Sequence, residues 1–138
     1  MLRKIILITA LLAPLTVSPA YPKLRPTQMK CLVDNVYYES RGEPIRGQML
    51  VARVTLNRAR DFHDGDICKA VYAPYQFSWT KGYKKKPNPE VYANAAKAAY
   101  AALWYYRPVY YFHAKHIKPA WAKQKTIVTK IGNHVFYR

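Results

Sequence analysis

The chain has 138 residues, enough for one domain with a modest core. Lys and Arg total 23 against seven Asp and Glu, which gives a formal net charge of +16. Such a charge predicts a polyanionic partner; the alternative is a solvated basic surface that aids solubility. Neither of the two cysteines has a second cysteine at metal-ligand spacing, which argues against a zinc–thiolate site.

Residues 1–20 have the pattern of a secretory signal peptide. Arg3 and Lys4 precede an apolar run over 5–15, and small residues stand before the cleavage position expected after Ala20. The run is shorter than the about 20 residues that span a bilayer, although an uncleaved anchor is the alternative. Loss of Arg3 and Lys4 lowers the formal charge from +16 to +14. We expect export to the periplasm, cell wall or extracellular space, where the anionic cell envelope, rather than nucleic acid, meets the basic surface.

Cys31 and Cys68 are predicted to form one disulfide if the chain is exported. The bond would close a loop of 37 residues. By the loop-entropy argument it would stabilise the fold by about 3–4 kcal/mol. In a reducing compartment the two residues would instead be buried thiols.

The first half of the chain predicts helices. A proline-bearing linker over 21–27 ends at Thr27, which is predicted to be an N-cap. A second helix over 46–60 is apolar almost all round, and is therefore predicted to be the buried centre of the fold. The first helix, up to Ser40, carries apolar residues at helical spacing: Met29, Leu32, Val33, Val36 and Tyr37.

The segment over 61–66 holds three aspartates. Because their spacing is not that of an EF-hand loop, local Asx turns and caps are predicted instead of a calcium site. A short helix is expected over 67–72 and an irregular segment over 73–88. Asn88-Pro89-Glu90 is a strong helix start, and the alanine-rich helix that follows should run to about Tyr106, before Pro108.

The last third predicts strands. Patterns of β-forming residues with a period of two cover 109–113, 126–131 and 134–137, and Gly132-Asn133 joins the last two as a hairpin. The predicted class is therefore α+β, a helical region followed by a small antiparallel sheet, in one domain over 28–138.

Glu39 is the first candidate for chemistry. At about 100° per residue it lies about 20° from Leu32, on the edge of the apolar face near the end of the first helix. Partial burial there would raise the pKa of its carboxyl, as a general acid at a glycosidic oxygen requires. The surplus of positive charge would lower the same pKa. The alternative is structural: pairing with Arg41 or Arg46, or capping the next helix.

Glu43 precedes Pro44 and is expected to be structural, because the helix dipole stabilises a carboxylate near the start of the second helix. Conventional glycosidases use two carboxylates, and no other acid in the chain is a clear partner for Glu39. A one-carboxylate mechanism, in which the substrate supplies the nucleophile, is therefore favoured.

Aromatic residues are numerous enough for a sugar-binding groove, although each ring alone is more typical of a core. Gln76 and Ser78 could hydrogen-bond acetamido or hydroxyl groups, and Trp79, in a polar irregular stretch, is the ring most expected to face a ligand. The rings considered are Phe77, Trp79, Trp104, Tyr110, Tyr111, Phe112, Trp121, Phe136 and Tyr137.

Three histidines support a rival function. His113, His116 and His134 could hold zinc, with Glu39 as the base of an amidase. However, His113 and His116 do not share a helix face and no HExxH motif is present, so neither a metal nor a cofactor is expected. A third possibility is a non-catalytic binder of anionic envelope or nucleic acid, whose binding would be salt-sensitive and indifferent to Glu39.

Several of these residues belong to one ordered pattern. It begins with Cys31-Leu-x-x-Asn-x-Tyr-x-Glu-Ser-Arg-Gly-Glu-Pro-x-x-Gly-Gln48 and continues with Val51-Ala-x-Val-x-Leu-Asn-Arg58. Later members are Cys68, Gln76-Phe-Ser-Trp79, Tyr111-Phe-His113, Pro119-x-Trp121 and Ile131-Gly-Asn-His-x-Phe-Tyr137. In this combination the chain resembles the SleB-type cell wall hydrolase family, which includes the spore-cortex-lytic enzymes. One departure is Tyr75, where many relatives carry a further cysteine.

The resemblance implies a lysozyme-like catalytic domain that cleaves peptidoglycan between N-acetylmuramic acid and N-acetylglucosamine. It also implies that Glu39 protonates the leaving oxygen and then acts as base while the muramoyl 6-hydroxyl closes a 1,6-anhydro ring, with hydrolysis by water as the alternative. We expect a monomer, either a bacterial remodelling enzyme or a phage lysis protein. Supporting residues are expected to be Ser40, Arg41, Glu43 and Gln48. Substrate contacts are expected from Gln76, Phe77, Ser78, Trp79, Tyr111, His113, Trp121 and His134.

Overall fold

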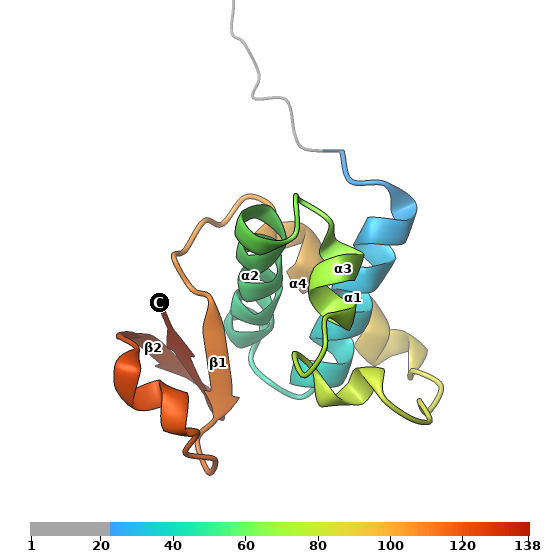
Figure 1. Ribbon diagram of the computed structural model, residues 1–138. Helices are drawn as coiled ribbons and strands as arrows, with labels where there is room; N and C mark the ends of the chain where they lie inside the picture. Colours follow the sequence, from blue (N-terminus) through green and yellow to red (C-terminus); the bar gives the residue numbers. More distant parts are fainter. Residues whose placement is uncertain (1–22) are drawn as a thin grey trace, which may run out of the picture.

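The computed structural model describes residues 23–138, so the signal peptide predicted for 1–20 lies outside the described residues. The long helices come first along this part of the chain and a small antiparallel sheet follows (Figure 1). The predicted α+β class is confirmed. Within 23–138, no helix combines the length and the apolar character needed to cross a membrane.

The first two helices are α1 (Pro26–Ser40) and α2 (Ile45–Phe62). α1 begins before Thr27, because Pro26 occupies the first helical position and Arg25 is the extended N-cap; the prediction of Thr27 as N-cap was wrong. The break between the helices includes Gly42, whose φ of 88° lies in the left-handed region that favours glycine.

The other two helices are α3 (Ile67–Tyr72) and α4 (Pro89–Ala102). Asp66 caps α3 by accepting a hydrogen bond from the backbone N–H of Lys69, and Asn88 caps α4 in the same way, as predicted. α4 ends four residues earlier than expected. Its last turn tightens, because the N–H groups of residues 103, 104 and 105 each donate to the carbonyl three residues back.

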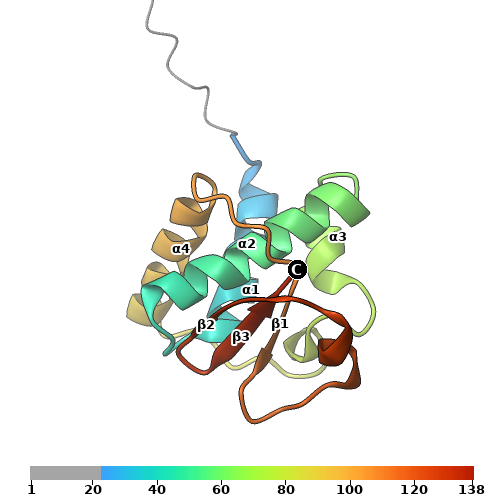
Figure 2. The same ribbon diagram turned by 90° about the vertical axis from the view of Figure 1, so that its left-hand side faces the viewer.

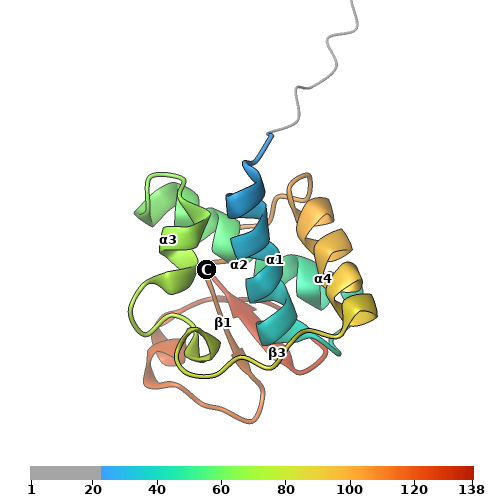
Figure 3. The same ribbon diagram turned by 90° about the vertical axis from the view of Figure 1, so that its right-hand side faces the viewer.

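α2 lies in the middle of the domain, as its apolar sequence predicted. Figure 3 shows α1 between α3 and α4 with α2 behind them, and Figure 2 shows the sheet on the opposite side of α2. The main hydrophobic cluster joins all four helices, and it includes the fully buried Leu32, Val36 and Ala52. A smaller cluster of Val51, Val54 and Phe136, among others, joins α2 to the sheet.

The sheet contains β1 (Tyr111–Ala114), β2 (Ile127–Ile131) and β3 (His134–Tyr137) in the order β1-β3-β2. Both pairings are antiparallel, and β3 is buried along its whole length. The β2–β3 hairpin turns at Gly132, whose φ is 54°.

A disulfide joins Cys31 of α1 to Cys68 of α3, as predicted. It fastens the two helices to each other across 37 positions of the sequence. The bonded pair lies two turns of α1 before Glu39, so it supports the helix that carries the candidate acid.

Candidate active site

A cleft of about 970 Å³ lies between the helices and the sheet. α1 contributes one residue to its lining and α2 contributes two. The rest come from the segment 75–78, from residues 110–125, and from the first residue of β3. The lining residues are Glu39, Val54, Arg58, Tyr75, Gln76, Phe77, Ser78, Tyr110, Tyr111, Phe112, His113, Ala114, Ile117, Pro119, Trp121, Gln124, Lys125 and His134.

Glu39 lines this cleft from the last turn of α1. The side chain is half-buried, and among residues 23–138 it has no hydrogen bond or ion pair, so the expected alternative of pairing with Arg41 or Arg46 is wrong. Burial raises the pKa of Glu39 to about 7. The basic surplus of the chain does not reverse this effect, because loss of solvation is the only cause acting on the carboxyl.

Glu39 is also the only carboxylate in the cleft. All seven acidic residues of the chain fall within the described part, and none of the other six lines the cleft. Asp34 pairs with Lys30 and accepts from Tyr92, Asp61 pairs with Arg60, and Asp66 caps α3. A double-displacement or inverting glycosidase needs a second carboxylate facing the first, and the cleft supplies none.

Glu43 lies outside the cleft and holds the hairpin against the α1–α2 junction. Its Oε2 accepts from the backbone N–H of Asn133 at 2.9 Å and its Oε1 accepts from the Asn133 side-chain amide at 3.1 Å. Gln48 donates to the Glu43 carbonyl at 2.9 Å and so fixes the same junction. The structural role predicted for Glu43 is consistent with these bonds, although its partner is the hairpin rather than the dipole of α2.

The other two supporting candidates also act on α1 rather than in the cleft. The Ser40 hydroxyl donates to the Val36 carbonyl at 2.7 Å inside the last turn. The guanidinium of Arg41 lies over the rings of Tyr37 and Tyr38, at 5.2 and 5.9 Å from their centroids. Both residues therefore stabilise the end of the helix that presents Glu39.

Seven of the eight predicted substrate-contact residues line the cleft, and Trp79 does not. Its indole N–H donates to Asn35 at 2.8 Å, and its ring stacks on Tyr38 with 4.7 Å between centroids. A polar neighbourhood in sequence was therefore a poor guide to this ring, because its partners come from α1. The neighbouring Gln76 and Ser78 are exposed at the cleft edge, whereas Phe77 is buried beneath them.

The sheet gives the cleft an aromatic wall. The His113 ring stacks on Tyr137 at 5.3 Å, and Trp121 meets both of these rings edge-on. His113 Nε2 lies 2.7 Å from the Tyr137 hydroxyl, and its Nδ1 lies 2.7 Å from the Ala114 carbonyl. Both ring nitrogens are thus occupied, and the imidazole is held in one orientation.

His134 is the most buried polar group of the cleft wall. Its Nδ1 has no hydrogen-bond partner, and its ring meets Phe112 edge-on at 5.1 Å. Burial lowers the pKa of His134, so the ring is neutral at pH 7. Residues 23–138 contain no group of three or more His, Cys, Asp or Glu arranged to hold a metal ion. The three histidines proposed as zinc ligands therefore do not form a ligand set.

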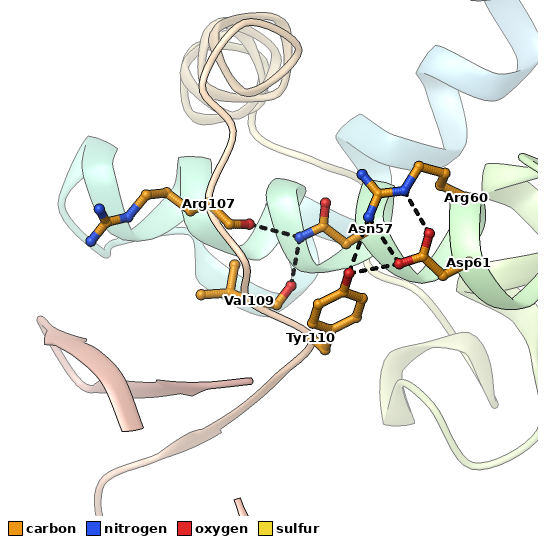
Figure 4. Close-up of polar contacts among 6 residues, drawn as sticks. All are labelled: Asn57, Arg60, Asp61, Arg107, Val109 and Tyr110. Atoms are coloured by element: carbon orange, nitrogen blue, oxygen red, sulfur yellow. Dashed lines mark hydrogen bonds and ion pairs between the residues drawn. The ribbon is translucent and has the colours of Figure 1, made fainter. Parts of the chain in front are cut away.

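α2 also positions the segment that enters β1. The Asn57 amide donates to the carbonyls of Arg107 and Val109, both at 2.8 Å (Figure 4). The hydroxyl of Tyr110 donates to Asp61 at 2.6 Å, and Asp61 is paired with Arg60 (Figure 4). β1 begins at Tyr111 instead of at the predicted residue 109, because the register pairs Tyr111 with Tyr137, the last residue of β3.

Three cleft residues of interest were not predicted. Arg58 is named in the sequence analysis only as the last residue of a family motif, and nothing in the local pattern singles out Lys125. Tyr75 was noted only as a departure from the family pattern. Its φ of 62° is uncommon for a residue with a side chain, and it places the ring, 89% exposed, at the cleft edge.

A family profile described as Cell Wall Hydrolase matches residues 42–137. The match covers more than half of the chain, so the chain belongs to the cell wall hydrolase family, and the resemblance found in the sequence is confirmed. Glu39 stands three residues before the matched range, so its role rests on the geometry of the cleft.

Solved structures extend this likeness to the fold. The catalytic domain of the germination-specific lytic transglycosylase SleB from Bacillus anthracis matches with a TM-score of 0.70 and 26% identity, over 85% of this chain and 98% of that one. The catalytic domain of Bacillus cereus SleB matches with a TM-score of 0.67 and 27% identity, over 85% and 94% of the two chains.

Two sequence relatives are spore cortex-lytic enzymes. The protein from Bacillus cereus is 29% identical over 113 residues, which cover 78% of this chain and 43% of the relative. The protein from Bacillus subtilis is 26% identical over 113 residues, which cover 78% and 36% of the two chains. This chain therefore spans less than half the length of these curated relatives.

Proposed function

We propose that this chain degrades peptidoglycan by cleaving the glycan bond between N-acetylmuramic acid and N-acetylglucosamine, with Glu39 as its single catalytic acid. One observation carries the proposal: Glu39 is the only carboxylate in the cleft, and burial raises its pKa to about 7. A carboxyl with that pKa is substantially protonated near neutral pH and can donate its proton. Membership of the cell wall hydrolase family supports the same reaction class.

Two proton transfers by one residue complete the reaction. Glu39 donates its proton to the glycosidic oxygen as the bond from that oxygen to the muramoyl C1 breaks, so that the leaving sugar departs as an alcohol. The resulting carboxylate then takes the proton of the muramoyl 6-hydroxyl as that oxygen bonds to C1 and closes a 1,6-anhydro ring. The lack of a second carboxylate in the cleft favours this lytic transglycosylation over a reaction that needs a second carboxylate.

The remaining cleft residues would bind and orient the glycan. Tyr111 and Trp121 offer ring faces for sugars, while the exposed Gln76 and Ser78 offer hydrogen-bonding groups for acetamido and hydroxyl substituents. We place the protein outside the cytoplasm after cleavage near Ala20, because its substrate is there. The excess of 23 basic over seven acidic residues would hold it on the anionic envelope.

Digestion of purified sacculi tests the proposal. The wild-type chain should release soluble muropeptides with 1,6-anhydro ends, and Glu39→Gln should release none above background. Glu90→Gln, an exposed acid at the start of α4, is the matched control and should act like wild type. Equal release by Glu39→Gln and wild type would overturn the assignment of Glu39. Reducing ends without anhydro products would show that water is the acceptor.

A further inference from the structure

Two cationic side chains lie close to one aromatic ring of the cleft wall. The guanidinium carbon of Arg58 lies 5.4 Å from the centroid of the Tyr111 ring, and the ammonium of Lys125 lies 4.2 Å from the same centroid. Arg58 comes from α2 and Lys125 follows the short 3-10 helix at Ala120–Gln124. All three residues line the cleft, so the chain brings two distant basic residues to one ring of the cleft that Glu39 also lines.

Neither of these cations is neutralised by the protein. The ion pairs among residues 23–138 are Lys30–Asp34 and Arg60–Asp61, and neither includes Arg58 or Lys125. Arg58 donates one hydrogen bond, to the Tyr110 carbonyl at 3.4 Å, and its Nε is buried without a partner. An arginine that lines a cleft therefore keeps most of its five donors unused.

Placing a charge in such a position costs free energy unless an opposite charge meets it. Burial lowers the pKa of Arg58; Tyr111 opposes this effect, but no carboxylate of the chain does. A guanidinium still remains protonated at any physiological pH. The planar fork of its donors fits the two oxygens of a carboxylate, so an anionic group on the ligand would supply the missing charge and hydrogen bonds together.

We propose that Arg58, Tyr111 and Lys125 form a subsite for a carboxylate of the glycan strand. The proposal rests on the proposed function and adds which chemical group of the substrate these residues bind. Peptidoglycan offers this group from two sources, the lactyl side chain of muramic acid and the stem peptide joined to it. The cleft accepts an anion readily, because its only acid, Glu39, is partly protonated at neutral pH.

Matched substrates separate the two sources. Denuded glycan strands carry free lactyl carboxylates, whereas intact strands carry their carboxylates on the stem peptides. Each preparation is compared with a portion in which carbodiimide has coupled the carboxylates to a neutral amine. At one fixed ionic strength, wild-type kcat/KM should be about tenfold higher on the free form than on the amidated form of the strand that the subsite reads. The glycan preparation whose free and amidated forms differ in kcat/KM identifies the source of the carboxylate.

Two lysine variants of equal charge provide the control. Lys125→Gln should lower kcat/KM about three- to fivefold more on free strands than on amidated strands. Lys123→Gln removes the same charge from an exposed position in the 3-10 helix that Lys125 follows, and Lys123 lies outside the cleft. It should change kcat/KM on free and on amidated strands by less than about twofold. Arg58→Lys keeps the positive charge but loses the planar fork of guanidinium donors, so it should lower kcat/KM on free strands more than Lys125→Gln does. Circular dichroism checks that this variant folds.

The outcomes also separate this subsite from the catalytic proposal. Two results would overturn the subsite and leave the proposed glycosidase activity intact. The wild type could cleave amidated strands as fast as free ones, or Lys125→Gln and Lys123→Gln could lose the same share of kcat/KM. If the wild type cleaves no glycan, the proposed function fails, and sedimentation of the chain with free and amidated strands still decides the subsite. Tighter binding to the free strands, weakened by Lys125→Gln alone, would support it, and equal binding would overturn it.

Discussion

Two glutamates on either side of the break at Gly42 have opposite surroundings. Glu43 accepts two hydrogen bonds from Asn133, at 2.9 and 3.1 Å, and fixes the hairpin to the helices. Glu39, one turn earlier, has no such partner in the described part of the chain and is held at a pKa of about 7. Glu43 fixes the structure, whereas Glu39 is left without a partner, as the proposed role of a catalytic acid requires.

The difference shows what can keep the pKa of a carboxylate high in so basic a protein. Cations and donors would stabilise the charged form of Glu39 and lower its pKa, as they do for Asp61 beside Arg60 and Tyr110. The end of α1 instead surrounds Glu39 with groups that use their polar atoms elsewhere: Ser40 bonds back to Val36, and Arg41 lies over aromatic rings. Burial without a partner, rather than a particular partner, keeps the pKa of Glu39 high.

The largest effect should come from exchanging each acid for its amide. Glu39→Gln should lower the rate of muropeptide release by about 10²–10⁴-fold, because the general acid is lost. Glu43→Gln should keep the chemistry and lower the free energy of unfolding by about 1–2 kcal/mol, through weaker bonds to Asn133. Initial rates and urea unfolding of both variants check this division. A large rate loss in a fully folded Glu43→Gln would contradict it.

Removing the disulfide should have the next largest effect. The double variant Cys31→Ser and Cys68→Ser opens a loop of 37 residues, which should lower the free energy of unfolding by about 4 kcal/mol. The bond lies away from the cleft, so the folded fraction should keep its activity. Denaturant unfolding gives the stability, and rates normalised to the folded fraction give the activity. A loss of specific activity without a loss of stability would place the bond among the functional features instead.

The pKa of Glu39 predicts a stability difference that depends on pH. Its folded value of about 7 lies above its ordinary value of 4.5, so the folded state favours the protonated form. Its contribution to stability is complete below pH 4.5 and is lost as the pH rises through 7. Between pH 4 and 8 the wild type should lose about 2–3 kcal/mol that Glu39→Gln keeps. Urea unfolding at both pH values, with Glu90→Gln as control, measures this difference in the free energy of unfolding. The same change with pH in wild type and Glu39→Gln would contradict the burial of Glu39 without a partner.

The last predicted effect concerns the hairpin that Glu43 holds. A Cβ on Gly132 would overlap the Glu43 carboxylate, and the φ of 54° would be strained. Gly132→Ala should therefore lower the free energy of unfolding by about 2–3 kcal/mol. Gly65→Ala is the matched control, because φ is 79° there and nothing lies within 4 Å, so only about 1 kcal/mol is expected. Equal losses in the two variants would mean that the contact with Glu43 contributes nothing.

Local sequence predicted the features that depend on neighbours along the chain. Asn88-Pro89 marked the start of α4, and the helical period placed Glu39 at the edge of the apolar face of α1. The end of α4 was predicted less well, because the tightening of its last turn is not encoded in a pattern. The class of fold was also predicted, and so were eight of the 18 residues that line the cleft.

The features that depend on contacts across the fold could not be predicted. Glu43 and Asn133 are 90 positions apart, and Trp79 finds its acceptor in Asn35, 44 positions away. Arg58 and Lys125 meet only because Tyr111 lies between the segments that carry them. Even the isolation of Glu39 is a tertiary property, since a pattern shows which residues are present and not which partners they find.

The strand order determines when the cleft can assemble during synthesis of the chain. β1 pairs only with β3 in the described sheet, although β2 separates them in the sequence. In a chain made from its N-terminus, α1 to α4 and the two cysteines are complete before His134–Tyr137 exists. Until then Tyr111 and His113 have no strand to pair with, and the aromatic wall of the cleft cannot assemble. We therefore expect a wall-degrading activity that appears only once His134–Tyr137 has been made, and chains arrested before His134 should be inactive in the sacculus assay.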